Sequence, residues 1–142
     1  MELNEIQVSY NSGSKGIKIT SAIDSYKALK PIFDDGMEFR EKSIALYLNK
    51  ANEVLGYFTL GLGGNSGVVM DVKMAFGIGL KCNASAMIMA HNHPSGNLQP
   101  SQADKNITKK FKEVGQLLDL QVLDHLILTS ESYYSFANEG LI

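Results

Sequence analysis

The stretch that decides the fold is AMIMAHNHPSGNLQPSQAD, residues 86–104. It begins with a short apolar run, which is typical of a strand buried on both faces of a sheet. The run ends at His91 and His93, and a segment with Pro and Gly follows. Ser101 and Asp104 then have the spacing of a helix capping box, with Asp in place of the usual Glu or Gln. The stretch therefore predicts a buried strand, a turn, and a helix that begins at Ser101.

The two histidines of this stretch are placed to act together. A strand puts residues i and i+2 on the same side, about 6.5–7 Å apart along the chain, so the imidazoles of His91 and His93 can converge on one ion. The seven residues that follow His93 are enough to bring the helix start back over the strand end. Asp104 can then serve as a helix cap, as a third ligand, or as both. Two histidines and one carboxylate form a catalytic zinc set that leaves a fourth position for water.

Length and composition indicate one soluble domain. The 142 residues suit a single hydrophobic core, and 44% hydrophobic and 20% charged residues are ordinary for a globular protein. No apolar run is long enough to span a bilayer, and the N-terminus lacks the pattern of a secretory signal. We therefore expect a cytoplasmic protein that does not contact membranes.

Charge and cysteine content narrow the function further. A formal charge of −2 argues against broad nucleic-acid affinity, and the one cluster of lysines is interpreted as a solvated helix face. This cluster consists of Lys105, Lys109, Lys110 and Lys112. The single cysteine, Cys82, excludes an internal disulfide and lies in an apolar segment, where a buried, unreactive thiol is the expected role.

Several further segments have the pattern of strands. SIALYLN (43–49) and EVLGYFTL (53–60) predict a hairpin around KAN, with Ile44, Leu46 and Leu48 on one face of the first strand. SYNSGSKGIKI (9–19) predicts two short strands around a turn, and VLDHLILT and YYSF predict the last two strands. The glycines of GLGGNSG (61–67) predict a flexible loop.

Three helices are expected. Ser21 and Asp71 are candidate N-caps for the first two, and Pro31 is expected to disturb or end the first. The apolar faces are Ile23, Tyr26 and Leu29 in the first helix, then Val72, Ala75, Phe76 and Leu80 in the second. The third, after Ser101, carries Ala103, Ile107, Phe111, Val114 and Leu118 on one face.

With these elements in place, the sequence resembles the RadC branch of the JAB/MPN domain family. His91-x-His93, seven residues and Ser101-x-x-Asp104 match that family's JAMM motif, and LLDLQVLDHLIL and YYSFANEGLI extend the likeness. It runs from about residue 38 to the C-terminus, so we expect an N-terminal extension, 1–37, packed on a domain of residues 38–142. The resemblance implies an α/β (α+β) fold: one JAB/MPN-like domain with a mixed, curved sheet flanked by helices, layered as in cytidine deaminases.

The resemblance also implies the chemistry of a zinc-dependent hydrolase. His91, His93 and Asp104 would be the ligands of Zn²⁺. Family members carry a glutamate upstream that moves a proton from the metal-activated water to the leaving amine. We assign this role to Glu41; Glu38 is the second candidate, and Glu53 is a distant third. The Ser101 hydroxyl would support the oxyanion in addition to capping its helix.

Three functions are compatible with these residues. We favour a zinc metallopeptidase or isopeptidase that acts on a peptide or protein substrate. The second is a DNA-repair-associated protein acting on or near DNA, which the acidic balance disfavours; the 37 residues before the match also predict no helix-hairpin-helix region. The third is a metal-stabilised interaction module without turnover, which the complete ligand set disfavours.

The letters HNH do not indicate an HNH nuclease, whose residues come from separated positions. Exposed sheet edges make a homodimer plausible.

Four other polar residues lie in or near the motif, and three of them are expected to support it. His125 lies inside an apolar strand, so we interpret it as a satisfied core residue or a partner of the ligands rather than a ligand. Its neighbour Asp124 is expected to point to the opposite face. Asn92 and Ser95 are candidates to hydrogen-bond the metal ligands.

Overall fold

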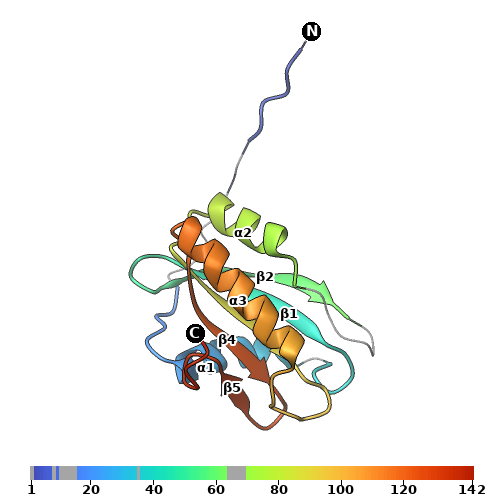
Figure 1. Ribbon diagram of the computed structural model, residues 1–142. Coiled ribbons are helices and arrows are strands. Elements are labelled where there is room, and N and C mark those ends of the chain that lie inside the picture. The colour runs from blue at the N-terminus through green and yellow to red at the C-terminus, as the bar shows by residue number, and fades with distance from the viewer. Residues whose placement is uncertain (1, 8, 10–15, 35, 64–69) are drawn as a thin grey trace.

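The computed structural model describes residues 2–7, 9, 16–34, 36–63 and 70–142. In this part of the chain the elements are α1 (Ala22–Phe33), β1 (Lys42–Leu48), β2 (Val54–Leu62), α2 (Val72–Lys81), β3 (Ala86–Asn92), α3 (Gln102–Leu117), β4 (Gln121–Leu128) and β5 (Tyr133–Ser135). The strands form one sheet in the order β2-β1-β3-β4-β5 (Figure 1). Only β3 and β4 are parallel neighbours, so the sheet is mixed, as predicted.

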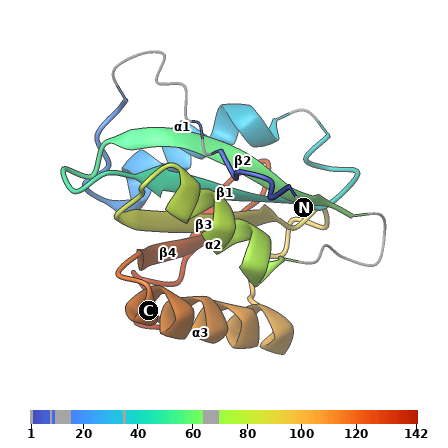
Figure 2. The same cartoon turned by 90° about the horizontal axis from the view of Figure 1, so that it is seen from above.

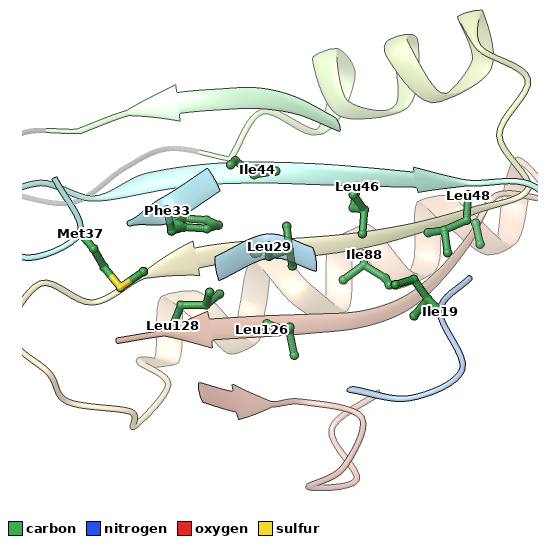
Figure 3. Close-up of a cluster of buried hydrophobic side chains, with 12 residues drawn as sticks. Ile19, Leu29, Phe33, Met37, Ile44, Leu46, Leu48, Ile88, Leu126 and Leu128 are labelled. Atoms are coloured by element: carbon green, nitrogen blue, oxygen red, sulfur yellow. The ribbon is translucent and has the colours of Figure 1, made fainter. Parts of the chain in front are cut away.

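The sheet is the middle layer of three. Figure 2 shows α1 on one face and α2 and α3 on the other. Side chains of β1 divide as strand periodicity predicts: Ile44 and Leu46 join the cluster under α1, whereas Ala45 and Tyr47 join the cluster under α2 and α3. Figure 3 shows the α1-side cluster, in which Leu29 and other apolar side chains lie over the sheet. All seven residues of β3 are buried, which confirms the prediction of a strand covered on both faces.

The segment β3-α3-β4 brings the two halves of the predicted motif together. Because β3 and β4 are parallel, α3 must carry the chain back along the sheet, and its first turn therefore lies at the carboxyl end of β3. Phe111 anchors the helix in the core, where it is fully buried. At Gly115 the helix lies so close to the connection into β4 that an added Cβ would be 2.5 Å from the Leu120 carbonyl oxygen and 3.2 Å from a methyl group of Val122 in β4.

The first helix differs from its prediction in two details. It continues through Pro31 to Phe33, because Pro31 lies in the last turn and its missing N–H affects only one intrahelical bond. Phe33 is fully buried, so the added residues bring an aromatic ring into the core. The Ser21 side chain makes no cap hydrogen bond; Asp24 instead accepts from the Thr20 backbone N–H at 2.9 Å and from its hydroxyl at 2.7 Å.

The predictions for the glycine loop, the first hairpin and the apolar helix faces agree only in part with the structure. Gly61 belongs to β2, where it pairs with Ser43, whereas Gly64 and Gly67 lie outside the described residues. Most of the first predicted hairpin, residues 10–15, also lies outside them, and Lys18 makes only an isolated bridge to Glu53. The predicted apolar faces were too wide at their ends, since these predicted core residues are exposed: Ile23, Leu80, Ala103 and Leu118.

Several local predictions are confirmed. Asp71 caps α2 by accepting from the Met74 N–H at 3.0 Å. Cys82 is partly buried rather than fully buried as predicted; burial raises the pKa of its thiol, which favours the protonated, less reactive form. The four clustered lysines of α3 are all exposed. None of the helices in the described part of the chain has the length and apolarity needed to cross a membrane.

The close approach of α3 to the connection that leads into β4 predicts opposite effects for two glycine substitutions. Gly115→Ala should lower the free energy of unfolding by about 1–3 kcal/mol, because the new methyl group meets a backbone carbonyl. Gly77→Ala in α2, where the added Cβ meets nothing within 4 Å, should raise stability by roughly 0.5–1 kcal/mol through helix propensity. Urea unfolding measures both. A Gly115→Ala protein as stable as Gly77→Ala would contradict the packing described.

Candidate metal centre

Three side chains from two elements converge at the carboxyl end of β3. His91 is the second-last residue of β3, His93 follows the strand, and Asp104 lies in the first turn of α3. The Nε2 atoms of the two histidines are 3.0 Å apart. His91 Nε2 is 3.4 Å from Asp104 Oδ1, and His93 Nε2 is 3.4 Å from Asp104 Oδ2. The structure thus brings together the three predicted ligands, whose donor atoms all lie within 4.8 Å of one another.

These distances and donor types fit a small divalent cation. Zinc bonds of about 2.0–2.1 Å in a tetrahedral site put neighbouring ligand atoms roughly 3.3 Å apart, close to the spacing found here. The orientation of His93 also fits, because its Nδ1 lies 2.6 Å from the Asn97 carbonyl oxygen and must carry the hydrogen of that bond. In the neutral ring, Nε2 then directs a lone pair at His91 and Asp104. Electron pairs converging at such distances repel one another unless a metal cation or a hydrogen lies between them.

The electrostatics of the site favour an ionised carboxylate. Burial disfavours the charge on Asp104, but the His91 and His93 rings donate hydrogen bonds to it whenever their Nε2 atoms carry a hydrogen. These bonds outweigh the effect of burial and hold the pKa of Asp104 well below the usual 3.8. The hydrogen bond with Asp104 in turn raises the pKa of His93 above 6.5, against the effect of burial. The negative charge of Glu41 contributes to the same rise, which places this carboxylate within electrostatic reach of His93.

A complete capping box holds Asp104 in place. The Ser101 hydroxyl oxygen accepts from the Asp104 N–H at 3.0 Å, and Asp104 Oδ2 accepts from the Ser101 N–H at 2.9 Å. The capping role of both residues is therefore confirmed. One oxygen of Asp104 faces both Ser101 and His93, so the same carboxylate stabilises the helix start and completes the ligand set.

Asn92 fixes the segment that carries Glu41. Its Nδ2 donates to the carbonyl oxygens of Met37 at 2.8 Å and Arg40 at 2.9 Å, and its Oδ1 accepts from the Lys42 N–H at 2.7 Å. Asn92 is 1% exposed, so these bonds replace water completely. We expected Asn92 to hydrogen-bond the metal ligands; it binds the segment before β1 instead, because it points to the opposite face of β3 from His91.

His93, one of the three candidate ligands, borders a cleft of about 570 Å³. The described residues that line it are Glu38, Phe39, Glu41, His93, Pro94, Ser95, Asn97, Gln99 and Ser101. Glu41 is half-buried and Glu38 is exposed, so both remain candidates for proton transfer. Glu53 is separated from the site, since it accepts from Asn49 in the β1–β2 hairpin at the other end of a strand about 20 Å long.

Cavity size alone does not select this cleft. A cavity of about 690 Å³ lies near the end of α3 and the start of β4, where Lys50, Lys112 and Asp119 are among its lining residues. Its described lining includes one carboxylate side chain and no histidine. The candidate site is therefore identified by its converging donor atoms rather than by volume.

Sequence reasoning missed three polar contributors to the site. Asn97 orients His93 through a backbone carbonyl, which leaves no signal in residue type. Thr108 lies one helical turn after Asp104 and donates to its carbonyl oxygen at 2.6 Å. Ser43 faces His91 across β1 and β3; its buried hydroxyl has no hydrogen-bond partner among the described residues.

His125 is a buried partner of the ligand set, as the sequence suggested. Its Nε2 lies 2.7 Å from His91 Nδ1, and the ring is 0% exposed. Burial holds the pKa of His125 well below 6.5, so the ring is neutral. Asp124 accepts from the Ser135 hydroxyl at 2.6 Å, the Ala137 N–H at 3.0 Å and the backbone N–H of His125 at 2.7 Å. The ring nitrogens of His125 have other partners, so the two side chains do not form a dyad.

The raised pKa of His93 predicts a pH-dependent metal affinity. A metal binds only the unprotonated ring, and Asp104 keeps the proton on His93 to a pH above the usual 6.5. We expect affinity to fall as the pH decreases from about 8 to 6, approaching tenfold per unit once His93 is mostly protonated. Chelator competition at a series of pH values measures this dependence. Constant affinity over that range would contradict it.

The contacts of Asn92 predict a stability defect without a metal defect. Asn92→Ala should lower the free energy of unfolding by about 2–3 kcal/mol, because two carbonyls and an N–H lose their buried partner. Metal affinity should change little, since no ligand side chain touches Asn92. Ser95→Ala, at an exposed turn position, is the control and should stay within about 0.5 kcal/mol of wild type. Equal stability of the two variants would refute the role of Asn92.

Comparison with known proteins agrees with the geometry. The profile of the RadC-like JAB domain matches residues 19–141, a range that includes α1. A UPF0758 protein of Flavobacterium johnsoniae is 47% identical over 124 residues, which cover 87% of this chain and 53% of that protein. A UPF0758 protein of Aquifex aeolicus is 36% identical over 140 residues, 99% of this chain and 59% of the relative.

A third relative is shorter. The UPF0758 protein YfjY of Escherichia coli is 44% identical over 107 residues, 75% of this chain and 66% of that protein. The chain thus spans between about half and two thirds of the length of these relatives. The profile match, the identities and the mixed sheet with its His-His-Asp group lead to one assignment: the chain belongs to the RadC-like JAB domain family.

Proposed function

We propose that this protein is a zinc-dependent metallopeptidase or isopeptidase. The observation that carries the proposal is the convergence of His91, His93 and Asp104 beside a cleft that also holds a glutamate and a serine hydroxyl. Three protein ligands are typical of a catalytic zinc site, whereas structural sites have four. Membership of the JAB family, which is often hydrolytic, supports the same conclusion.

The three ligands would hold the metal, and other residues would handle protons. A bound zinc ion supplies a Lewis acid that lowers the pKa of water to about 7 and polarises a carbonyl group. The Glu41 carboxylate is the candidate general base, which accepts a proton from the attacking water and later delivers it to the leaving amine. Its backbone is held on both sides, by the Gly63 N–H on the Glu41 carbonyl oxygen at 2.8 Å and by Asn92 on the adjoining residues.

Ser101 is arranged to donate a hydrogen bond into the cleft. Its hydroxyl oxygen already accepts from the Asp104 N–H, so its own hydrogen is not used by the cap. Because Ser101 also lines the cleft, this hydrogen can be directed at the oxyanion that forms when water attacks a carbonyl. One side chain would thus combine helix capping with stabilisation of the transition state.

The charge of the cleft favours an amide substrate over a phosphodiester. The described lining includes Glu38 and Glu41 and no lysine or arginine, so it would repel a nucleic-acid backbone. The exposed lysines lie along α3 instead. An acidic cleft suits a reaction whose leaving group becomes a cationic amine, as happens when an isopeptide bond to a lysine side chain is cleaved. We therefore place peptide or protein amides first among the substrates.

The proposal predicts that metal binding and turnover can be separated by mutation. Glu41→Gln should keep about one zinc per chain and lose roughly 10²–10⁴-fold of the hydrolysis rate, because the amide cannot accept the proton. His93→Ala should lose both zinc and activity. The assay combines metal analysis with cleavage of linear peptides and lysine-linked isopeptides.

The control for this experiment is Glu38→Gln, which changes the other carboxylate of the cleft. It should retain most of the activity if Glu41 is the base. Full activity of Glu41→Gln with loss in Glu38→Gln would transfer the role to Glu38. Wild-type protein that binds no metal would refute the proposal, as would protein that cleaves only a DNA oligonucleotide assayed in parallel.

A further inference from the structure

A chain of short hydrogen bonds runs behind the candidate ligands, away from the cleft. His91 Nδ1 lies 2.7 Å from His125 Nε2, and His125 Nδ1 lies 2.6 Å from Thr108 Oγ1. Thr108 Oγ1 lies 2.6 Å from the carbonyl oxygen of Asp104. His125 is 0% exposed and Thr108 is 1% exposed, so water does not compete for these contacts. The chain joins a ligand on β3 to a ligand on α3 through a residue of β4.

The carbonyl group at one end sets the direction of every bond. A backbone carbonyl oxygen only accepts, so the single hydroxyl hydrogen of Thr108 is donated to Asp104. Thr108 must then accept from His125, which places a hydrogen on His125 Nδ1. If Thr108 instead donated to His125, the Thr108 hydroxyl oxygen and the Asp104 carbonyl oxygen would lie 2.6 Å apart with no hydrogen between them. A buried neutral imidazole carries one hydrogen, so Nε2 of His125 is an acceptor.

The direction continues into the metal centre. His125 Nε2 accepts, so His91 must donate from Nδ1, and in the neutral ring its Nε2 has a free lone pair. This is the same atom that lies 3.0 Å from His93 Nε2 and 3.4 Å from Asp104. We propose that His125 and Thr108 are positioning residues that hold His91 in the Nδ1–H tautomer, with Nε2 free for a metal. The inference rests on the metal-binding part of the proposed function.

Packing fixes the ring of His125 in the orientation that this role requires. The ring is stacked on Phe136, with centroids 4.7 Å apart and planes at 11°. A rotation of the ring about its axis would break both hydrogen bonds at once, in a place where no water can replace them. Partners that orient a ligand imidazole in this way are worth 10–100-fold in metal affinity. The affinity of the site should therefore depend on side chains that never touch the metal.

Two amide substitutions at His125 distinguish a role in orienting His91 from a role in filling space in the core. The Gln side chain places an oxygen near the position of His125 Nε2 and can still accept from His91, whereas Asn reaches only the Nδ1 position. We expect His125→Asn to lose about 10–100-fold in zinc affinity and His125→Gln to stay within about threefold of wild type. Thr108→Val should lose affinity and Thr108→Ser should keep it. Zinc alone, with competing chelator, is the probe.

Equal zinc affinity of the Asn and Gln variants would overturn the proposal, since a role in packing alone would affect both. Circular dichroism and urea unfolding of each metal-free variant show whether it is folded. A loss of affinity in Thr108→Val at wild-type stability supports positioning without any change at His125. Unchanged affinity in that variant counts against the hydrogen-bond chain.

A second readout does not require metal at all. In metal-free wild-type protein at about pH 9, where imidazoles are neutral, long-range ¹H–¹⁵N spectra report which ring nitrogen carries the hydrogen. We expect Nδ1–H for both His91 and His125; an Nε2–H form of His91 would overturn the inference. If the protein binds no zinc but shows these tautomers, the proposed function fails while the assignment of the hydrogen-bond chain and of the His91 tautomer stands.

Discussion

The parallel pairing of β3 with β4 is the constraint on which the site depends. Parallel neighbours cannot be joined by a tight turn. The chain therefore crosses the face of the sheet that α2 and α3 cover, as α3, and returns to the end of the sheet at which β3 began. The crossover brings the first turn of α3 to the end of β3, and the reciprocal bonds of Ser101 and Asp104 stop that turn from fraying. A metal at this point would bind a carboxylate that the fold has already placed and ionised.

Alternation along β3 gives adjacent residues different roles. His91 faces α3 and is a candidate ligand, whereas Asn92 faces the other way and holds the segment that carries Glu41. The candidate base and the candidate ligands are thus tied to the same strand from opposite faces. A shift of one residue in the register of β3 would exchange the two sides and lose both functions at once.

The parts of the fold that periodicity controls could be predicted from the sequence. β1 alternates with period 2, β3 is a continuous apolar run, and α3 has a helical pattern with a clear N-cap; the structure has all three near the expected positions. The His-His-Asp group that could hold a metal was predictable because its spacing is local: a strand end, a short connection and one helical turn. The continuation of α1 past Pro31 was not, since it depends on burial of Phe33 rather than on local preference.

The supporting contacts were harder to predict for a different reason. Thr108, Asn97 and Ser43 act through tertiary neighbours or through backbone atoms, and neither leaves a pattern in residue type. His125 could be recognised as buried, but its partners come from β3 and α3, which are distant in sequence. Sequence therefore predicts which atoms could bind a metal more readily than what orients them.

The stacking of Phe136 on His125 has a consequence for any attempt to transplant this site. A designer who grafted only the His-x-His and Ser-x-x-Asp segments onto another sheet would copy the donor atoms. No neighbouring group would then determine which ring nitrogen of each imidazole carries the hydrogen. The graft would also need a neighbouring strand with a histidine that contacts the first imidazole, as β4 provides here. It would further need an aromatic ring stacked on that histidine, which the segment after β5 provides. The smallest portable unit of this chemistry is a folded half-domain rather than a motif.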